Sequence, residues 1–409
     1  MAGVFRVGLL RVLSINSTNK LLANRSELIV PIRTISGKNA RAIAPPTNKP
    51  KPWPYKTKGY NIFNSLYDKT TSRFDENSKI IVVEGPIAAG KTKLAKELAA
   101  ELDMLYLPEA NLDMLTTNIY GFNLKKLNDQ IPESLRFYDI PDFLLNPRHK
   151  MTACFQMRQY VAKFSQYIDA LAHVFSTGQG VILDRCVYSD FVFMESMFKL
   201  KYISPEARSI YYDARSCSID ELLRPHLIIY LDIPVEKVMA NVQKRNYTCE
   251  KDSEVINPKY LKSMEDLYKL EYLKKLSTHS ELLIYDWSEQ GDIEVVVEDI
   301  ERIDFSRIDE QDAKVKDWVY HLEEEYGCLR NKYADKKNQL MMYLNIPRFD
   351  APELLADGQD FQTYSELVLN SPGNAYETGF NPAMGDNILF RVRDYPNCET
   401  LPLIERSLS

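Results

Sequence analysis

The sequence lacks paired cysteines and long apolar runs. Its 409 residues include six cysteines, and none of them forms a C-x-x-C pair or stands beside two histidines. A zinc site is therefore not expected, and scattered buried thiols in a reducing compartment are the simpler interpretation. No apolar stretch approaches the roughly 18 residues that a membrane-spanning helix needs. We expect no direct membrane span, so any membrane association would come through a partner.

Glycine is scarce, and neither sign of charge dominates. The chain has 15 glycines, and its formal net charge is -6. This charge gives no electrostatic reason to expect a nucleic-acid partner. The cysteine spacing offers no ligand set for an iron–sulfur cluster, and no G-x-G-x-x-G run is present for a dinucleotide such as FAD. We therefore expect neither an iron–sulfur cluster nor a flavin.

Acidic side chains are nearly absent from the first fifty residues. This stretch holds eight basic side chains and one acid, Glu27. Such a composition is typical of a mitochondrial presequence, which we expect over residues 1–35. Arg33-Thr34-Ile35-Ser36 resembles the pattern cut by the matrix processing peptidase, whereas a secretory signal fits less well because arginines interrupt its short apolar pieces. Residues 36–78 predict an extended Pro-rich, basic strap.

Apolar runs alternate with helical patterns in the middle of the chain. The longest helical patterns cover 148–177 and 257–277, and the apolar runs cover 80–84, 104–107, 180–184, 227–231 and 282–285. Alternating strands and helices predict an α/β fold. We expect a P-loop domain over 79–305, with three α/β/α layers and a five-stranded parallel sheet. Ligands of such a sheet bind at the carboxyl ends of its strands.

One segment carries a phosphate-binding pattern. Residues 85–92, Gly-Pro-Ile-Ala-Ala-Gly-Lys-Thr, fit G-x-x-x-x-G-K-[ST] between the first strand and a helix. Gly85 and Gly90 allow a tight turn, Lys91 would reach the β- and γ-phosphates, and the Thr92 hydroxyl would hold Mg²⁺. A chance Gly-rich turn is the alternative, expected in about one chain in a hundred. The sequence therefore predicts a mononucleotide site.

Three further residues stand where they could serve phosphoryl transfer. Glu109 follows the second strand, where a carboxylate could accept a proton from an attacking hydroxyl, although a surface acid is an equal alternative. Arg185 could stabilise phosphate charge or form a structural salt bridge. Gln156 offers a donor and an acceptor for the edge of a base, but alone it carries no information.

The C-terminal extension, residues 306–409, has a different character. Residues 306–345 are charged and show a helical pattern, whereas the chain beyond Asn345 has six prolines and no periodic core, which predicts irregular structure. Large amphipathic side chains are frequent in this extension and in the strap. Because such side chains are typical of interfaces, we expect both segments to make partner contacts.

Together, these motifs resemble the deoxynucleoside kinase family over residues 79–305. Segment 85–92 matches the phosphate loop of the family, and Glu109 matches its catalytic base. Phe155-Gln156 matches the pair that recognises the nucleobase, and 184–190 is similar to the family's Asp/Glu-Arg-Ser segment. The resemblance implies Glu109 and Arg185 as catalytic candidates, vestigial or of low activity. It also implies a purine nucleotide with Mg²⁺, bound by Gly85, Ala88, Ala89, Gly90, Lys91, Thr92, Gln156, Asp190, Arg245 and Glu250.

Several positions depart from the family pattern. Met114 stands where a tryptophan lines the nucleoside pocket, and Leu144 where a tyrosine holds the sugar 3′-hydroxyl. The lid, residues 241–247, keeps only Arg245; three expected arginine positions hold Asn241, Gln243 and Tyr247. One arginine can be worth about 10³-fold in the rate of phosphoryl transfer. Such a pocket should therefore bind nucleotide but phosphorylate poorly.

The combination of presequence, altered kinase domain and long extension resembles the kinase-like accessory subunits of mitochondrial respiratory complex I. This resemblance implies a matrix-side subunit, peripheral to the inner membrane, that supports assembly or stability without electron transfer. Its partners would be other complex I subunits beside the membrane arm. The alternative is an active mitochondrial deoxynucleoside kinase, which transfers a phosphoryl group from ATP to a deoxynucleoside 5′-hydroxyl. A nucleoside monophosphate kinase shares the fold but explains the Phe-Gln and Asp-Arg-Cys segments less well.

Overall fold

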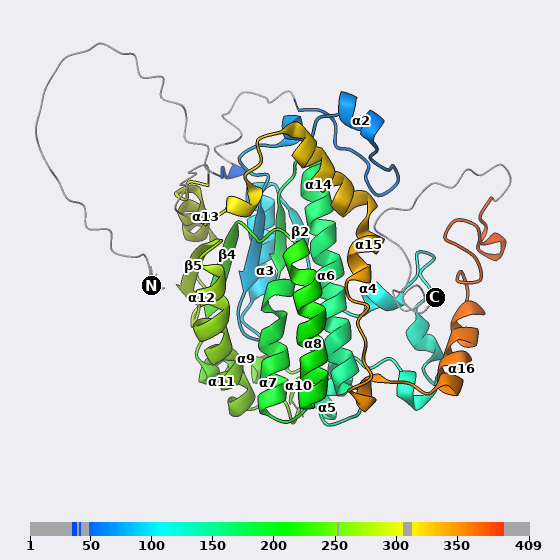
Figure 1. The fold of residues 1–409 in the computed structure, drawn as a ribbon. Helices are drawn as coiled ribbons and strands as arrows, with labels where there is room; N and C mark the ends of the chain where they lie inside the picture. The colour runs from blue at the N-terminus through cyan, green and yellow to red at the C-terminus, as the bar shows by residue number, and fades with distance from the viewer. Residues whose placement is uncertain (1–34, 39–40, 42–48, 252, 306–312, 388–409) are drawn as a thin grey trace, which may run out of the picture.

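A five-stranded sheet forms the centre of the protein. The computed structural model describes residues 35–38, 41, 49–251, 253–305 and 313–387 (Figure 1). All strands are parallel, in the order β2-β3-β1-β4-β5. Their bounds are β1 Ile80–Glu84, β2 Leu105–Leu107, β3 Val181–Asp184, β4 Leu227–Asp232 and β5 Glu281–Asp286. The predicted α/β class and five-stranded parallel sheet are confirmed.

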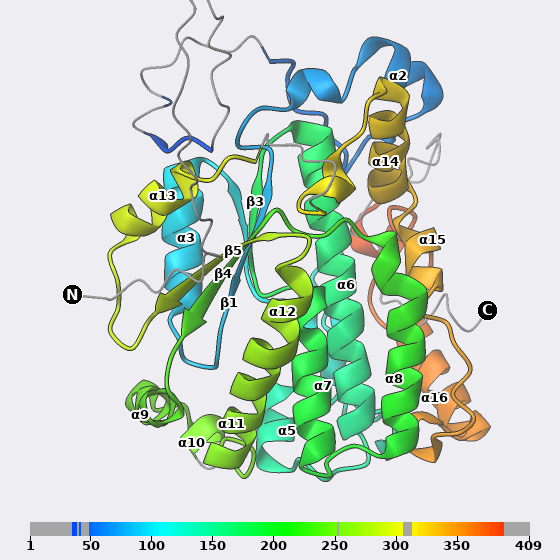
Figure 2. The same cartoon turned by 60° about the vertical axis from the view of Figure 1, so that its left-hand side comes forward.

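Helices cover both faces of the sheet (Figure 2). On one face lie α3 (Lys91–Leu102) and α13 (Ile293–Glu301). On the other face lie α6 (Thr152–Thr177), α7 (Asp190–Lys199), α11 (Pro258–Leu267) and α12 (Leu273–Leu276), the last two joined by a π-helical turn, with α8 (Pro205–Ser218) outside them. Because both faces are covered, the central strands are fully buried, which explains their aliphatic, β-branched sequences.

The remaining helices are mostly short. Those near the carboxyl ends of the strands are α4 (Asp113–Thr116), α5 (Ile140–Leu145), α9 (Val235–Arg245) and α10 (Thr248–Lys251). Those in the strap and the extension are α2 (Ile62–Tyr67), α14 (Glu323–Asp335), α15 (Lys337–Met342) and α16 (Gly358–Leu369). Among the described residues, no helix combines the length and the apolar character needed to cross a bilayer.

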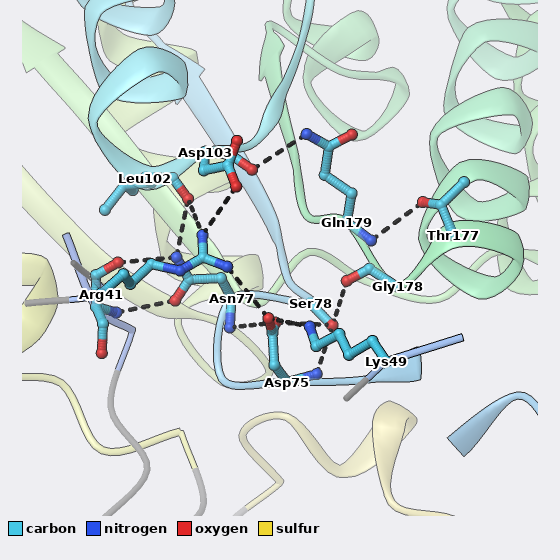
Figure 3. Close-up of polar contacts among 11 residues, drawn as sticks. Arg41, Lys49, Asp75, Asn77, Ser78, Leu102, Asp103, Thr177, Gly178 and Gln179 are labelled. Atoms are coloured by element: carbon cyan, nitrogen blue, oxygen red, sulfur yellow. Dashed lines mark hydrogen bonds and ion pairs between the residues drawn. The ribbon is translucent and has the colours of Figure 1, made fainter. Parts of the chain in front are cut away.

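Polar contacts tie the N-terminal residues to the start of β1 (Figure 3). The Asn77 side chain accepts a hydrogen bond from the Ser36 N–H at 2.9 Å and donates one to the Leu102 carbonyl at 2.8 Å. Asp75 forms ion pairs with Arg41 and Lys49. These contacts fix the strap at the amino-terminal edge of the sheet.

Ile35 belongs to the folded part of the chain. Its side chain is 1% exposed and packs in the main core. The sequence analysis assigned this residue to the presequence, whose other residues, 1–34, lie outside the described part of the chain. Removing a buried isoleucine would leave a cavity, so Ile35 contributes to the stability of the core.

The first described residues of the extension form an anchor where a helical pattern was expected; residues 306–312 lie outside the described part of the chain. Of the described residues in this stretch, 313–322 hold only a short 3-10 turn, and α14 starts at Glu323. The Trp318 ring stacks on Phe175 of α6 with centroids 5.7 Å apart, and its Nε1 donates to the Arg224 carbonyl at 2.7 Å. Packing of this tryptophan explains why the charged helical pattern is interrupted here.

A helix also forms in the tail that was expected to be irregular. On α16, Tyr364 and Val368 are buried against Leu124, Ile131 and Phe137. The expected irregular structure beyond Asn345 was therefore wrong for this helix, although its buried residues pack against residues 124–137 and not in a core of the tail's own. Its apolar residues recur at helical spacing from Phe361 onward, but the prolines on either side of this stretch favoured a prediction of irregular structure.

Candidate functional site

The phosphate loop joins β1 to α3 in a compact turn. Gly85 has a φ of +151°, and a Cβ at this position would lie 2.9 Å from the Leu231 carbonyl oxygen. Gly90, immediately before α3, has a φ of +81°. Both conformations favour glycine. The turn brings the N-terminus of α3, with its partial positive charge, to the carboxyl ends of the strands, where anions bind well.

Lys91 is buried within this loop. Its Nζ donates to the Pro86 carbonyl at 2.8 Å, and the residue is 6% exposed. Burial and the neighbouring Arg185 lower the pKa of Lys91 to about 8, although Glu109 and Asp184 oppose this shift. Most Lys91 side chains are therefore charged at neutral pH, and an arriving phosphate would raise this pKa again.

Glu109 and Arg185 form an ion pair beside the loop. Their closest atoms, Glu109 Oε1 and Arg185 Nη1, are 2.5 Å apart, and Arg185 Nη2 donates to the Gly85 carbonyl at 3.1 Å. Burial alone would raise the pKa of Glu109, but Arg185, Lys91 and Lys163 outweigh it and lower this pKa to about 2. The carboxylate is thus ionised at neutral pH, the form that can accept a proton.

Thr92 contacts the carboxylate of Asp184, which ends β3 and was not among the predicted ligands. The Thr92 hydroxyl donates to Asp184 Oδ2 at 2.5 Å, and the other Asp184 oxygen, Oδ1, is buried without a hydrogen-bond partner in the described structure. Such an orphaned carboxylate oxygen beside a hydroxyl suits a hard cation. No group of three or more His, Cys, Asp or Glu side chains is placed to hold a metal ion within the described ranges, so nucleotide oxygens would have to supply further ligands.

A buried polar cluster lies beneath Gln156. The Asp190 carboxylate, fully buried, accepts hydrogen bonds from Gln156 at 2.9 Å, Lys163 at 2.7 Å and Tyr211 at 2.8 Å. Asp190 therefore fixes Gln156 and Lys163 and does not itself line the cleft. Sequence reasoning missed Lys163, although its spacing of two helical turns from Gln156 puts both on one face of α6.

The single lid arginine already has an internal partner. Arg245, at the end of α9, forms an ion pair with Glu250 of α10 and lies over the Tyr247 ring at 4.6 Å. Asn241 donates to the Ala88 carbonyl at 3.2 Å, where the family has a cationic side chain. The lid thus presents one arginine to the cleft, and Glu250 partly neutralises its charge; the lid's other cation, Lys244, does not line the cleft.

These groups surround one cleft of about 720 Å³. Two of the predicted site residues, Gly85 and Asp190, do not line the cleft. The other predicted site residues do line it: Ala88, Ala89, Gly90, Lys91, Thr92, Glu109, Gln156, Arg185, Arg245 and Glu250. Lys93, Lys96 and Lys163 also line it, which makes six cationic side chains. Arg185, Arg245 and Lys163 are paired with Glu109, Glu250 and Asp190, so the excess comes from the lysines at 91, 93 and 96. This excess of positive charge attracts a polyanion.

On the apolar side of the cleft, two residues differ from the pattern of the deoxynucleoside kinases that the sequence resembles. Phe143 and Phe155 stack with centroids 5.4 Å apart, and Leu144 lines the cleft without offering a hydroxyl. Met114 is not among the lining residues; it is 45% exposed, with its sulfur 4.0 Å from the Gln166 amide. The position of the family's tryptophan therefore contributes nothing to this wall.

Comparison with known proteins places the chain in a family. Residues 81–322 match the profile of the family described as deoxynucleoside kinase, which is more than half of the chain. The chain therefore belongs to the deoxynucleoside kinase family. Among relatives, it is 34% identical to the mouse protein named NADH dehydrogenase [ubiquinone] 1 alpha subcomplex subunit 10, mitochondrial, over 78% of this chain and 86% of that protein.

Other relatives are named as enzymes. The chain is 29% identical to the deoxyguanosine kinase of Dictyostelium discoideum, over 61% of this chain and 77% of that protein. A solved deoxyadenosine kinase from M. mycoides with bound dATP is 18% identical and aligns with a TM-score of 0.40, over 54% of this chain and 96% of that one.

Proposed function

We propose that this protein is an accessory subunit of mitochondrial NADH:ubiquinone oxidoreductase, complex I. In this proposal it carries no electrons, supports the assembly or stability of the complex, and sits on the matrix side of the membrane arm. It enters the matrix with the help of the N-terminal presequence, which is removed. Its kinase-type cleft retains a nucleotide and has little catalytic activity.

The observation that carries this proposal is the extent of the likeness to the mouse subunit. That likeness covers 78% of the chain, whereas the family match stops at residue 322 and the likeness to the Dictyostelium kinase covers 61%. The likeness to the subunit thus extends into segments that the kinases do not share. These segments accompany the kinase-type fold but are not needed for phosphoryl transfer. They are therefore candidates for contacts with other proteins.

The cleft supports the nucleotide part of the proposal. Lys91 and the N-terminus of α3 would bind the phosphates, and the apolar wall around Phe155 would hold the base. Magnesium would be held through the nucleotide by Thr92, with Asp184 as a second protein group, because the unpartnered Asp184 oxygen lies beside the Thr92 hydroxyl. The ion would neutralise phosphate charge.

The alternative function, deoxynucleoside kinase, is favoured by the intact Glu109–Arg185 pair. A rescue experiment separates the two. In cells depleted of the protein, we expect Glu109→Gln to restore the amount of assembled complex I as fully as the wild-type chain does. A kinase function predicts instead that Glu109→Gln fails to restore the phosphorylated deoxynucleoside pool while assembled complex I is unaffected by depletion. That second pattern would contradict the proposal.

The extension and strap are proposed as the partner-binding surfaces. Deleting residues 346–409 should leave the main core folded but lower incorporation into the complex. Because α16 covers Leu124, Ile131 and Phe137, hydrogen exchange in the segment around them should also rise. A matched pair sharpens the test: Val368→Ser removes a buried contact, whereas Leu369→Ser changes a side chain that is 51% exposed. Normal incorporation of the truncated protein, seen by comigration with the complex, would rule the tail out.

A further inference from the structure

One short helix exposes an apolar face at the edge of the molecule. On α2, Phe63, Leu66 and Tyr67 follow the i, i+3, i+4 spacing of one helix face, and their side chains are 72%, 69% and 91% exposed. Figures 1 and 2 place α2 at the end of the molecule opposite α5, α9 and α10, which border the nucleotide cleft. The kinase-type site makes no use of this face.

Contacts with α14 hold α2 in this exposed position. Before the helix, the Tyr60 N–H donates to the Asp335 carboxylate at 2.9 Å. After it, the Asp68 carboxylate accepts from Arg330 at 2.7 Å and pairs with Arg73. Arg330 is fully buried and also lies 3.7 Å from the Tyr60 ring centroid. Since both ends are clamped, the apolar face is presented by a fixed structure.

The segment that carries α2 is rich in lysine, although α14 beside it contributes Glu323, whose carboxylate accepts hydrogen bonds from Thr70 and Thr71. Between residues 49 and 73 the sequence contains a single acid, Asp68, which is engaged by two arginines. The same stretch carries exposed lysines at positions 51, 56, 58 and 69. An apolar face carried by a lysine-rich segment complements an anionic surface that also offers an apolar interior.

We propose that α2 and the lysines around it bind the surface of an anionic phospholipid bilayer. The apolar face would enter the level of the headgroups while the lysines contact phosphates. For α2 taken alone a protein partner fits less well, because a stable protein interface buries about 800 Å² on each side and a helix of six residues offers much less. The rest of the strap stays available for the partner contacts proposed above. Membrane association was expected only through a partner, and α2 adds a direct contact. This inference does not depend on the proposed function.

The test measures binding of the purified full chain to vesicles. We expect cosedimentation with vesicles of phosphatidylcholine and cardiolipin, and much weaker binding to pure phosphatidylcholine. The variant Phe63→Ser/Leu66→Ser/Tyr67→Ser should reduce binding at least about tenfold, since the inserted apolar area supplies much of the affinity. Phe349→Ser, which changes a side chain that is 82% exposed outside the strap, should bind as the wild type does.

Each other outcome speaks against the proposal. Absence of wild-type binding to cardiolipin vesicles would overturn it, as would equal binding by the triple variant with an unchanged thermal unfolding curve. If the wild type binds neither kind of vesicle and the triple variant fails to enter a protein complex, the apolar face of α2 is a protein-docking site. Lys51→Glu/Lys69→Glu supplies a second arm, because it should weaken binding to anionic vesicles without touching the apolar face.

Discussion

Replacing Lys91 by alanine is expected to weaken the binding of a purine nucleoside triphosphate with Mg²⁺ by about 10- to 100-fold. The lysine would form charge-assisted hydrogen bonds to the phosphates, and such bonds contribute about 1.5–3 kcal/mol. Isothermal titration calorimetry on the purified protein measures the effect. Lys275→Ala, which changes a lysine paired with Glu271 outside the cleft, is the control and should bind normally. Absence of binding by the wild type would contradict the retained nucleotide site.

The lowered pKa of Lys91 predicts that nucleotide affinity depends on pH. Because the pKa of Lys91 in the free protein is lowered to about 8, a rising fraction of the chains loses this charge as the pH passes through that value. Nucleotide affinity should therefore fall between about pH 7 and 9 in the wild type. The Lys91→Ala variant should show a flatter profile over the same range.

The second large effect concerns turnover. We expect the wild-type protein to phosphorylate deoxynucleosides far more slowly than the range of about 1–10³ per second typical of enzymes, because Arg245 is the single arginine of the lid and is paired with Glu250. A coupled assay on protein freed from its complex measures the rate. Turnover within the usual range would favour the kinase alternative.

A gain-of-function variant tests the cause of the low rate. Asn241→Arg/Gln243→Arg/Tyr247→Arg returns cations to the lid and should raise turnover by at least about tenfold, since a single arginine can be worth about 10³-fold. Lys244→Arg keeps the charge of the lid unchanged and serves as the matched control. An equal rate in both variants would show that the missing arginines do not limit catalysis.

The sheet could be predicted from the sequence because its signals are local. The aliphatic runs at 80–84 and 227–231 correspond to β1 and β4 almost residue for residue, and the phosphate loop has a pattern fixed by its backbone conformation. Parallel strands place their carboxyl ends together, so the convergence of Glu109 and Arg185 on that loop also followed from the sequence.

The features that were missed depend on contacts between distant residues. Asp184 could be placed at a strand end, but its unpartnered oxygen is visible only in three dimensions. The pairing of Arg245 with Glu250 and the burial of Asp190 under Lys163 are likewise tertiary. The helix α16 was missed because its short apolar repeat lies among prolines, and its packing partners Leu124 and Phe137 are more than two hundred residues away in the sequence.

The central claim is that this member of the deoxynucleoside kinase family works as part of complex I. The most direct measurement is native gel electrophoresis of mitochondria solubilised in mild detergent, followed by detection of this protein. The account predicts comigration with the fully assembled NADH:ubiquinone oxidoreductase and loss of that band when assembly of the complex is blocked. Migration of the whole pool as a small, free protein with deoxynucleoside kinase activity would contradict it.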